Sequence, residues 1–241
     1  MIAQIVEIID VYWLLILVGQ FPEGPLGGLA LTLCMALAGL IGAIPLALVA
    51  GVIRTCPGTI AYYPISAFVH AIRGTPVLLL IFWAYFAVPL LFGGSISGVA
   101  TVVIALIVYE VAFLAEVLRA GIEALPKGQI EAARTLGLSY RQAMQDVILP
   151  QALFNVIPSI ISQFINLVKN TSLGYIISVH ELTYTAYQVN SQLLTGTLPV
   201  FTLLAIIYFC ICFSLSQAVS WAERKVERLR IAPQQANGGL R

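Results

Sequence analysis

The sequence contains few charged residues. Asp, Glu, Lys and Arg make up only 10% of its 241 residues, whereas 60% are hydrophobic. This composition lies outside the range of soluble domains and indicates a chain that is embedded in a membrane. The formal net charge of +1 gives no basic surface of the kind that binds nucleic acid.

Motifs that carry chemistry are also missing from the sequence. The four cysteines have neither disulfide nor metal-site spacing. The glycine-rich phosphate-binding sequence of ATPases does not occur, and no nucleophile lies in a pattern with a general base. We therefore expect a protein that is not an enzyme, without a metal site or a cofactor of its own.

The N-terminal segment, Met1 to Val18, is apolar but has no basic residue, and it carries Glu7 and Asp10. It therefore lacks the positive region of a cleaved signal peptide. Its uncharged part is too short to cross a bilayer. The pattern predicts a helix that lies in the membrane interface.

Five apolar segments are suited to cross about 30 Å of hydrocarbon. Their approximate bounds are 26–53, 76–92, 97–119, 151–168 and 197–219. The predicted fold is an all-α membrane protein with five transmembrane helices in a single domain, residues 1–230. A disordered tail, 231–241, is expected to follow.

The longest polar segment lies between the third and fourth apolar segments. Residues 129–136 are good helix formers, and Gly137 can adopt the left-handed conformation that ends a helix. Ser139 and Gln142 have the spacing of a capping box that starts a second helix, and Pro150 marks the next boundary. The segment is therefore predicted to form two short helices joined by a tight turn, which suits a contact with a partner.

The same residues, 133–139, also resemble the helix-turn-helix of DNA-binding proteins. Membrane-like segments flank them on both sides, which argues strongly against that interpretation. No nucleic-acid partner is expected.

The spacing of this polar segment resembles the coupling loop of permease subunits of ABC importers. The matching residues are Glu131, Ala132, Ala133, Gly137, Val147, Leu149 and Pro150. The resemblance implies that the loop, residues 126–149, docks into a groove on a cytoplasmic ATPase. ATP and Mg would be bound by that ATPase and not by this chain.

Other segments resemble the permeases for polar amino acids. Residues 73–76, Arg-Gly-Thr-Pro, are similar to a step of that group, and the likeness is nearly unbroken from Arg73 to Leu182. The sequence Tyr109-Glu110 is similar to a Phe-Glu of some permeases for acidic amino acids, which favours glutamate or aspartate slightly. The resemblance implies a pair of ATPases, a second permease subunit of the same or a related sequence, and a periplasmic solute-binding protein as partners, in the lipid of a bacterial inner membrane.

The third predicted span contains two carboxyl groups. Arg119 ends it near one membrane face, which places Glu116 about one turn inside and Glu110 about 13 Å inside. Glu116 is spaced to pair with Arg119, whereas Glu110 has no such local partner. An ionisable group at that depth is expensive and suggests function. A neutral or paired carboxyl retained for packing explains Glu110 equally well.

Polar residues also cluster at the end of the fourth span. In the family, a stretch similar to Lys169–Leu173 forms a partly inserted gate near the translocation path. Irregular polar backbone at membrane depth is tolerated only in protein or beside water. An ordinary external loop is the alternative. The predicted substrate pathway comprises Glu110, Glu116, Asn166, Lys169, Thr171 and Ser172.

The basic residues predict the orientation. With five spans and the N-terminus outside, nearly all of them fall on the inner side. They are Arg54, Arg73, Arg119, Lys127, Arg134, Arg141 and the four that follow Trp221, and only Lys169 falls near the outer half. The C-terminus is therefore predicted to be cytoplasmic. A channel or secondary transporter without an ATPase is the alternative function, but its expected internal repeats are not recognisable.

Overall fold

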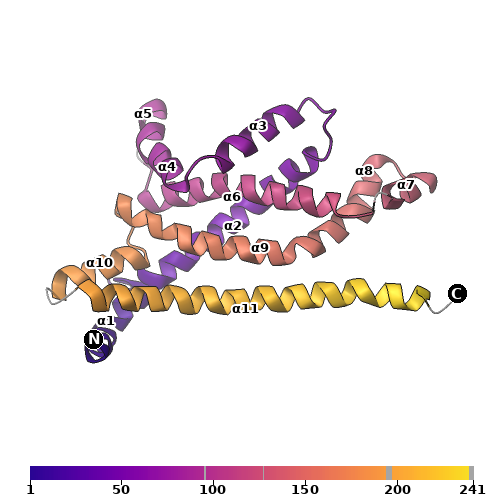
Figure 1. Cartoon of the computed structure of the whole chain (residues 1–241). Coiled ribbons are helices and arrows are strands. Elements are labelled where there is room, and N and C mark those ends of the chain that lie inside the picture. Colours follow the sequence, from indigo (N-terminus) through magenta and orange to yellow (C-terminus); the bar gives the residue numbers. More distant parts are fainter. Residues whose placement is uncertain (95, 127, 194–196, 239–241) are drawn as a thin grey trace.

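The computed structural model describes residues 1–94, 96–126, 128–193 and 197–238, and within this part regular structure is helical (Figure 1). The α-helices are α1 (Ile2–Val18), α2 (Gly28–Ile53), α3 (Tyr62–Arg73), α4 (Val77–Phe82), α5 (Val88–Phe92), α6 (Gly98–Glu123), α7 (Gly128–Thr135), α8 (Tyr140–Gln142), α9 (Leu149–Thr171), α10 (Leu182–Leu193) and α11 (Thr197–Gly238). π-helical turns at Trp83–Ala87 and Ala143–Ile148 join α4 to α5 and α8 to α9, and a 3₁₀ helix, Ser172–Ile177, follows α9.

Four helical segments of the described chain are long and apolar enough to cross a membrane. They are Gly28–Ile53, Gly98–Glu123, Tyr140–Ile177 and Thr197–Lys225. A fifth span would be made by the pair Tyr62–Arg73 and Val77–Leu91, which is bent by 106°. The all-α prediction is therefore confirmed, with four or five spans.

The predicted second span, 76–92, corresponds to α4, the π-helical turn and α5, which run from Val77 to Phe92. In the structure it is the second half of the bent pair that begins with α3. Pro76 disfavours helical backbone in the residue before it, so the helix that contains Arg73 ends there and a new one starts at a different angle.

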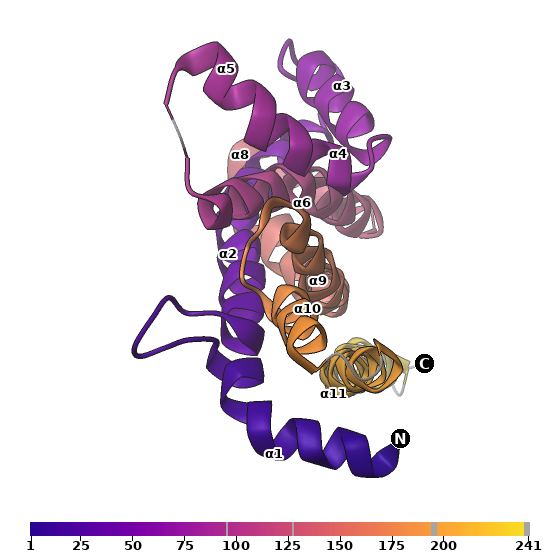
Figure 2. The same cartoon turned by 90° about the vertical axis from the view of Figure 1, so that its left-hand side faces the viewer.

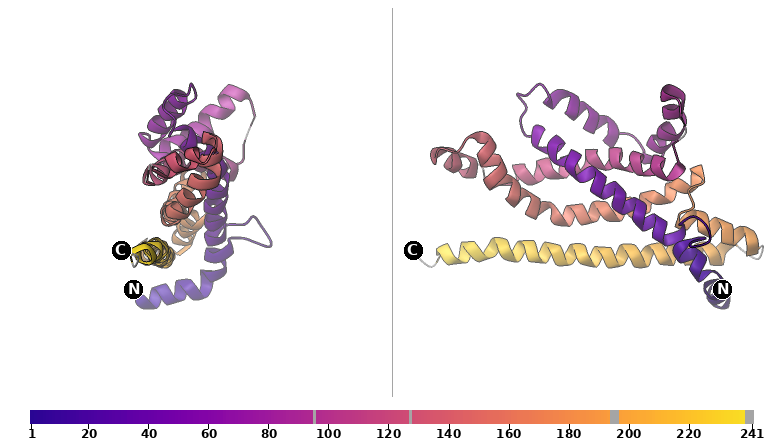
Figure 3. Two further views of the ribbon diagram at one scale, coloured as in Figure 1. Left: turned by 90° about the vertical axis from the view of Figure 1, so that its right-hand side faces the viewer. Right: turned by 180° about the vertical axis from the view of Figure 1, so that it is seen from behind.

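The helices form a bundle whose two ends differ. α7, α8 and the C-terminal part of α11 lie at one end, and α1 and α10 lie at the other (Figures 1 and 3). α1 lies across the direction of α11 (Figure 2), which is the orientation expected of an interfacial helix. The N-terminus and the end of α11 therefore lie at opposite ends of the bundle.

α2 packs closely against α6 through small residues on one face. Gly39, Ala43, Ala47 and Gly51 follow one another at intervals of four along this face. A Cβ atom on Gly51 would lie 2.9 Å from the Leu118 Cβ atom and 3.0 Å from the Ala115 carbonyl oxygen. Small residues allow backbones to approach in this way, and membrane helices associate largely through such packing.

We expect Gly51→Val to lower the thermal stability of the purified protein, because its side chain would force α2 and α6 apart. Overpacking of this kind costs about 1–3 kcal/mol. The matched control is Gly58→Val, since a Cβ atom on Gly58 meets nothing within 4 Å. Equal melting temperatures for the two variants would contradict the close contact.

The predicted fourth span, 151–168, is shorter than the helical segment that the structure shows. Helical structure is continuous from Tyr140 to Ile177. Pro150 lies in the first turn of α9, where a missing N–H is tolerated, so it does not interrupt the path. The polar residues Lys169 to Ser172 likewise belong to the end of α9 and the start of the 3₁₀ helix, and not to an irregular stretch.

The C-terminal helix is also longer than predicted. α11 continues to Gly238, so residues 231–238 of the predicted tail are helical in the structure. Pro233 lies within this stretch and lacks a backbone N–H, which is why the sequence favoured an end to the helix there. Residues 239–241 of the predicted tail lie outside the described residues.

Candidate functional site

The polar segment between α6 and α9 forms the predicted pair of short helices. Gly137, at φ 87°, has the left-handed conformation that was predicted. The Leu138 N–H donates to the Ala133 carbonyl oxygen over 3.1 Å, and the Gly137 N–H donates to that of Arg134 over 3.0 Å. These two bonds are the helix-ending motif that glycine favours, and they fix the direction in which the chain leaves α7.

The second short helix begins with the predicted capping box. The Ser139 side chain accepts a bond from the Gln142 backbone, and the Gln142 side chain accepts one from the Ser139 backbone. Gln129 and Gln151 exchange two side-chain amide bonds, of 3.2 and 2.9 Å, which join α7 to the first turn of α9. The two short helices, with the turn between them, are hereafter the coupling pair.

The coupling pair presents an exposed tip to solvent. Leu136 is 84% exposed, although leucine is usually buried. Glu131, Ala132, Gly137 and Pro150 are exposed, while Ala133 is buried and Leu149 is half-buried. Four of the six residues predicted to meet an ATPase are therefore accessible, whereas Ala133 is buried.

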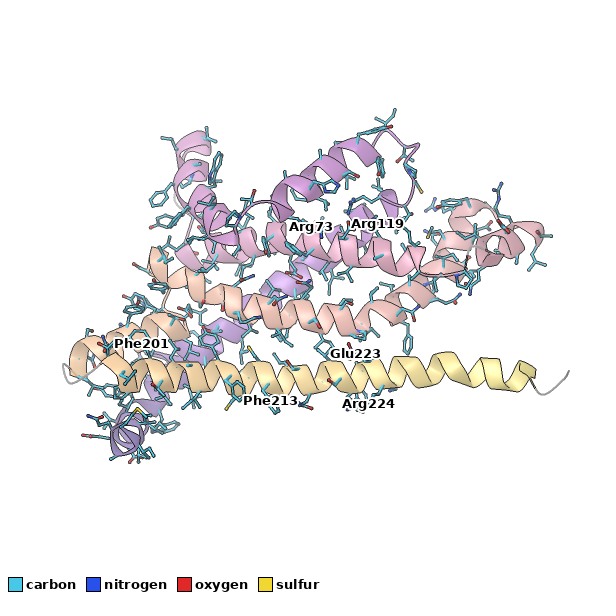
Figure 4. All side chains as sticks on the ribbon, viewed as in Figure 1. Arg73, Arg119, Phe201, Phe213, Glu223 and Arg224 are labelled. Carbon is cyan, nitrogen blue, oxygen red and sulfur yellow. The ribbon has the colours of Figure 1, made fainter. Side chains whose placement is uncertain are left out.

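A cluster of charges lies where α2, α3 and α6 meet. The predicted pair of Glu116 with Arg119 is confirmed, at 2.5 Å. Arg54 and Arg73 also bind Glu116, and Arg119 binds Glu123 at 2.5 Å. Figure 4 labels Arg73 and Arg119 at this junction.

Sequence reasoning did not anticipate that three arginines would share one carboxylate. The available signal was that Arg54, Arg73 and Arg119 all fall near ends of apolar segments on the same predicted side of the membrane. We name Glu116 and its three arginines the Glu116 cluster.

Glu110 is separate from this cluster. Its side chain is fully buried, and neither carboxyl oxygen has a hydrogen-bond partner among the described residues. Leu106 and Leu114, one turn away on either side, belong to the apolar packing between α6, α2 and α9. Within the described helices, Glu110 therefore lies between two apolar layers.

α9 carries a stripe of polar residues at helical spacing. Its members are Asn155, Ser159, Ser162, Asn166 and Lys169, and none of them is buried. The stripe brings together Asn166 and Lys169, two of the predicted pathway residues. The Asn166 amide donates weakly to Gln163, at 3.4 Å, and no described ion pair includes Lys169.

Two further predicted pathway residues, Thr171 and Ser172, lie where α9 passes into the 3₁₀ helix. Thr171 is fully buried, and its hydroxyl donates to the Val168 carbonyl oxygen over 2.7 Å. Ser172 donates to the Lys169 carbonyl oxygen over 2.6 Å. Both hydroxyls thus donate hydrogen bonds to carbonyl oxygens near the end of α9.

A buried carboxyl that was not among the predicted site residues begins α10. Glu181 is fully buried and accepts bonds of 2.9 Å from the Thr183 and Tyr184 N–H groups. The Tyr208 hydroxyl donates to it from α11 over 3.3 Å. Glu181 therefore holds α10 to α11, and an acidic residue directly before a helix is the sequence signal for such a cap.

A helical membrane bundle with an exposed coupling pair and no nucleotide-binding sequence defines a class of transport subunits that work with a separate motor. The family described as "binding-protein-dependent transport system inner membrane component" matches residues 43–228, and the chain belongs to this family. It is therefore a multi-pass inner-membrane permease of the ABC transporter class, which has no ATPase activity of its own.

Named relatives and a solved structure agree with this family. The probable glutamine ABC transporter permease protein GlnP of Bacillus subtilis (strain 168) is 39% identical over 193 residues, which cover 79% of this chain and 88% of that protein. The glutamine transport system permease protein GlnP of Escherichia coli (strain K12) is 32% identical, over 84% of this chain and 92% of that protein. A crystal structure of an amino acid ABC transporter with histidines superposes with a TM-score of 0.75 at 30% identity, covering 82% of this chain and 92% of that one.

Proposed function

We propose that this chain is the permease subunit of an ATP-driven importer of polar amino acids. The observation that carries the proposal is the exposed coupling pair, built on the predicted glycine turn and capping box, in a chain of this family. Glutamine is the leading substrate because two of the relatives are named for it. Glutamate and aspartate, which the sequence favoured slightly, are the competing substrates.

The polar stripe of α9 suggests where the substrate passes. Polar side chains on a membrane-spanning helix are costly against hydrocarbon. The stripe therefore faces a second permease subunit, the same or related, with the aqueous pathway between the two. Asn166 and Lys169 line this pathway in our proposal, and the Lys169 ammonium suits the carboxylate of an amino acid. Glu110, Thr171 and Ser172 would join it only if α6 and α9 move.

The coupling pair is proposed to dock on a cytoplasmic ATPase. Glu131, Ala132, Ala133, Gly137, Leu149 and Pro150 form or support the docking surface. ATP and Mg would be held by the ATPases, and a periplasmic solute-binding protein would deliver the substrate at the opposite face. This chain supplies the pathway and the mechanical contact.

The proposed orientation places the C-terminus and the coupling pair in the cytoplasm. A cysteine label within residues 126–129, or one after Arg230, is expected to react only when the inner face of the membrane is accessible. The reason is the concentration of basic residues on that side. The control is a label in the loop at Gly93–Gly94, which should react from outside. Labelling of the first two sites in intact cells would reverse the orientation.

Reconstitution tests the proposed function. The purified complex with its ATPases, placed in liposomes with the solute-binding protein, should accumulate labelled glutamine only when ATP is present on the ATPase side. Competition by glutamate, aspartate and arginine would rank the substrate class. Uptake without ATP, or purification without an associated ATPase, would support the alternative of a channel or secondary transporter.

A further inference from the structure

The Glu116 cluster joins three helices through a single carboxylate. The Arg119 guanidinium donates to Glu116 Oε1, and those of Arg54 and Arg73 approach Oε2, the latter at 3.5 Å. These arginines come from the end of α2, the end of α3 and the body of α6. Movement of any one of the three helices must therefore alter contacts at Glu116.

The three contacts are not equally secure. The Arg54 side chain is only 5% exposed and also donates to Ser66 of α3 at 3.4 Å, so its release would leave a buried charge unpaired. The Arg73 side chain is 36% exposed and makes the longest contact. Water can solvate Arg73 if it leaves Glu116, which makes this the contact that can open at small cost.

Arg73 also makes a second contact with α6, the helix that carries Glu116. Its guanidinium lies 5.6 Å from the centre of the Phe113 ring, within the range of a cation–π interaction. Phe113 precedes Glu116 by one turn of α6. Arg73 therefore holds the end of α3 to α6 through two contacts at once, and the contact with Phe113 can persist when the longer one with Glu116 opens.

The position of the cluster connects the coupling pair to the bent helix. Beyond Glu116, the end of α6 packs through Leu118 and Ile122 onto Met144, Ile148 and Ala152, which lie in and beside the π-helical turn that follows α8. On the other side, Arg73 is the last residue of α3 and directly precedes the 106° bend. A shift of the coupling pair thus reaches the bend through α6 and the pair of Arg73 with Glu116.

We propose that Arg73 and Glu116 are positioning residues for energy coupling, whose ion pair is closed in the arrangement described here and opens when the coupling pair moves on the ATPase. Opening it frees the bend between α3 and α4 to change its angle. This role differs from the substrate contact predicted for Glu116, and it rests on the proposed function as an ATP-driven importer.

The test compares Arg73→Gln, Glu116→Gln, the double variant and the matched control Glu123→Gln, each in the reconstituted complex. Arg73→Gln should raise ATP hydrolysis in the absence of loaded binding protein by about two- to fivefold, the factor that corresponds to a partly exposed ion pair. The ratio of stimulated to unstimulated hydrolysis should fall accordingly. Glu123→Gln removes the same charge from an exposed pair and should leave both rates within about twofold.

Further measurements separate positioning from a merely structural role. The double variant should change the hydrolysis ratio little more than Glu116→Gln alone, because Glu116→Gln already removes the ion pair that Arg73→Gln removes. Arg73→Lys should restore part of the ratio, and the melting temperature of Arg73→Gln should stay near that of the unchanged protein. Additive effects, or a normal ratio in Arg73→Gln, would overturn the inference. Failure of the unchanged complex to couple uptake to ATP would instead overturn the proposed function.

Discussion

Replacing Gly137 with valine is expected to abolish most of the substrate-stimulated ATP hydrolysis while leaving a folded permease in the membrane. Gly137 has φ +87°, and a Cβ atom there would meet nothing within 4 Å. The penalty is therefore conformational, about 1–2 kcal/mol, and is best relieved by a change in the turn. Such a change would swing α8 relative to α7. We expect stimulation to fall by about tenfold or more, because small displacements of a working contact cost large factors in rate.

The measurement is hydrolysis by the reconstituted complex with and without loaded binding protein, together with retention of the ATPase during purification. Gly58→Val is the control, since Gly58 also has open space around it but has no left-handed backbone. Glu131→Lys should weaken docking in the same assay, because it reverses an exposed charge in the first turn of α7. Full stimulation in both Gly137→Val and Glu131→Lys would remove the coupling pair from the mechanism.

Replacing Glu110 with leucine is expected to raise thermal stability and to lower transport at the same time. The two carboxyl oxygens are buried without a hydrogen-bond partner among the described residues. A buried unsatisfied polar group costs about 1–3 kcal/mol, which an apolar side chain of similar size would recover. A stabilising substitution that reduces uptake by about tenfold would show that the carboxyl is retained for function rather than for packing.

Melting temperature and glutamine uptake are measured on the same preparations. Leu106→Met provides the control, because it conserves volume one turn away on the same face of α6 and should leave both quantities nearly unchanged. Normal uptake by Glu110→Leu would show that the carboxyl acts neither in the substrate pathway nor in coupling. A lower melting temperature would contradict the observation that the carboxyl has no hydrogen-bond partner among the described residues.

Features set by neighbouring residues could be predicted from the sequence. The left-handed Gly137 and the capping box of Ser139 with Gln142 depend on backbone geometry within a few residues, and the structure confirms both. The pairing of Glu116 with Arg119 followed from their spacing on one helix. The apolar runs identified most of the spans, because only a long helix satisfies its backbone in hydrocarbon.

Features set by distant residues could not be predicted in the same way. The convergence of Arg54 and Arg73 on Glu116 requires the packing of α2 and α3 against α6, which no local pattern encodes. The continuation of helical structure through Pro150 was not predicted, because a proline is found in the first turn of a helix as well as at a helix boundary. The polar stripe of α9 could have been found from the sequence, because all its members except Lys169 lie within the predicted span 151–168.

The π-helical turn at Ala143–Ile148 has a consequence for the geometry of the whole subunit. Such a turn holds more residues per turn than an α-helix, and an α-helix rotates by about 100° for each residue. If the same residues wound as α-helix instead, α8 would be rotated by about 100° about the axis of α9. The angular phase between the surface offered to the ATPase and the side of α9 that bears Asn166 and Lys169 therefore depends on the π winding of this one turn.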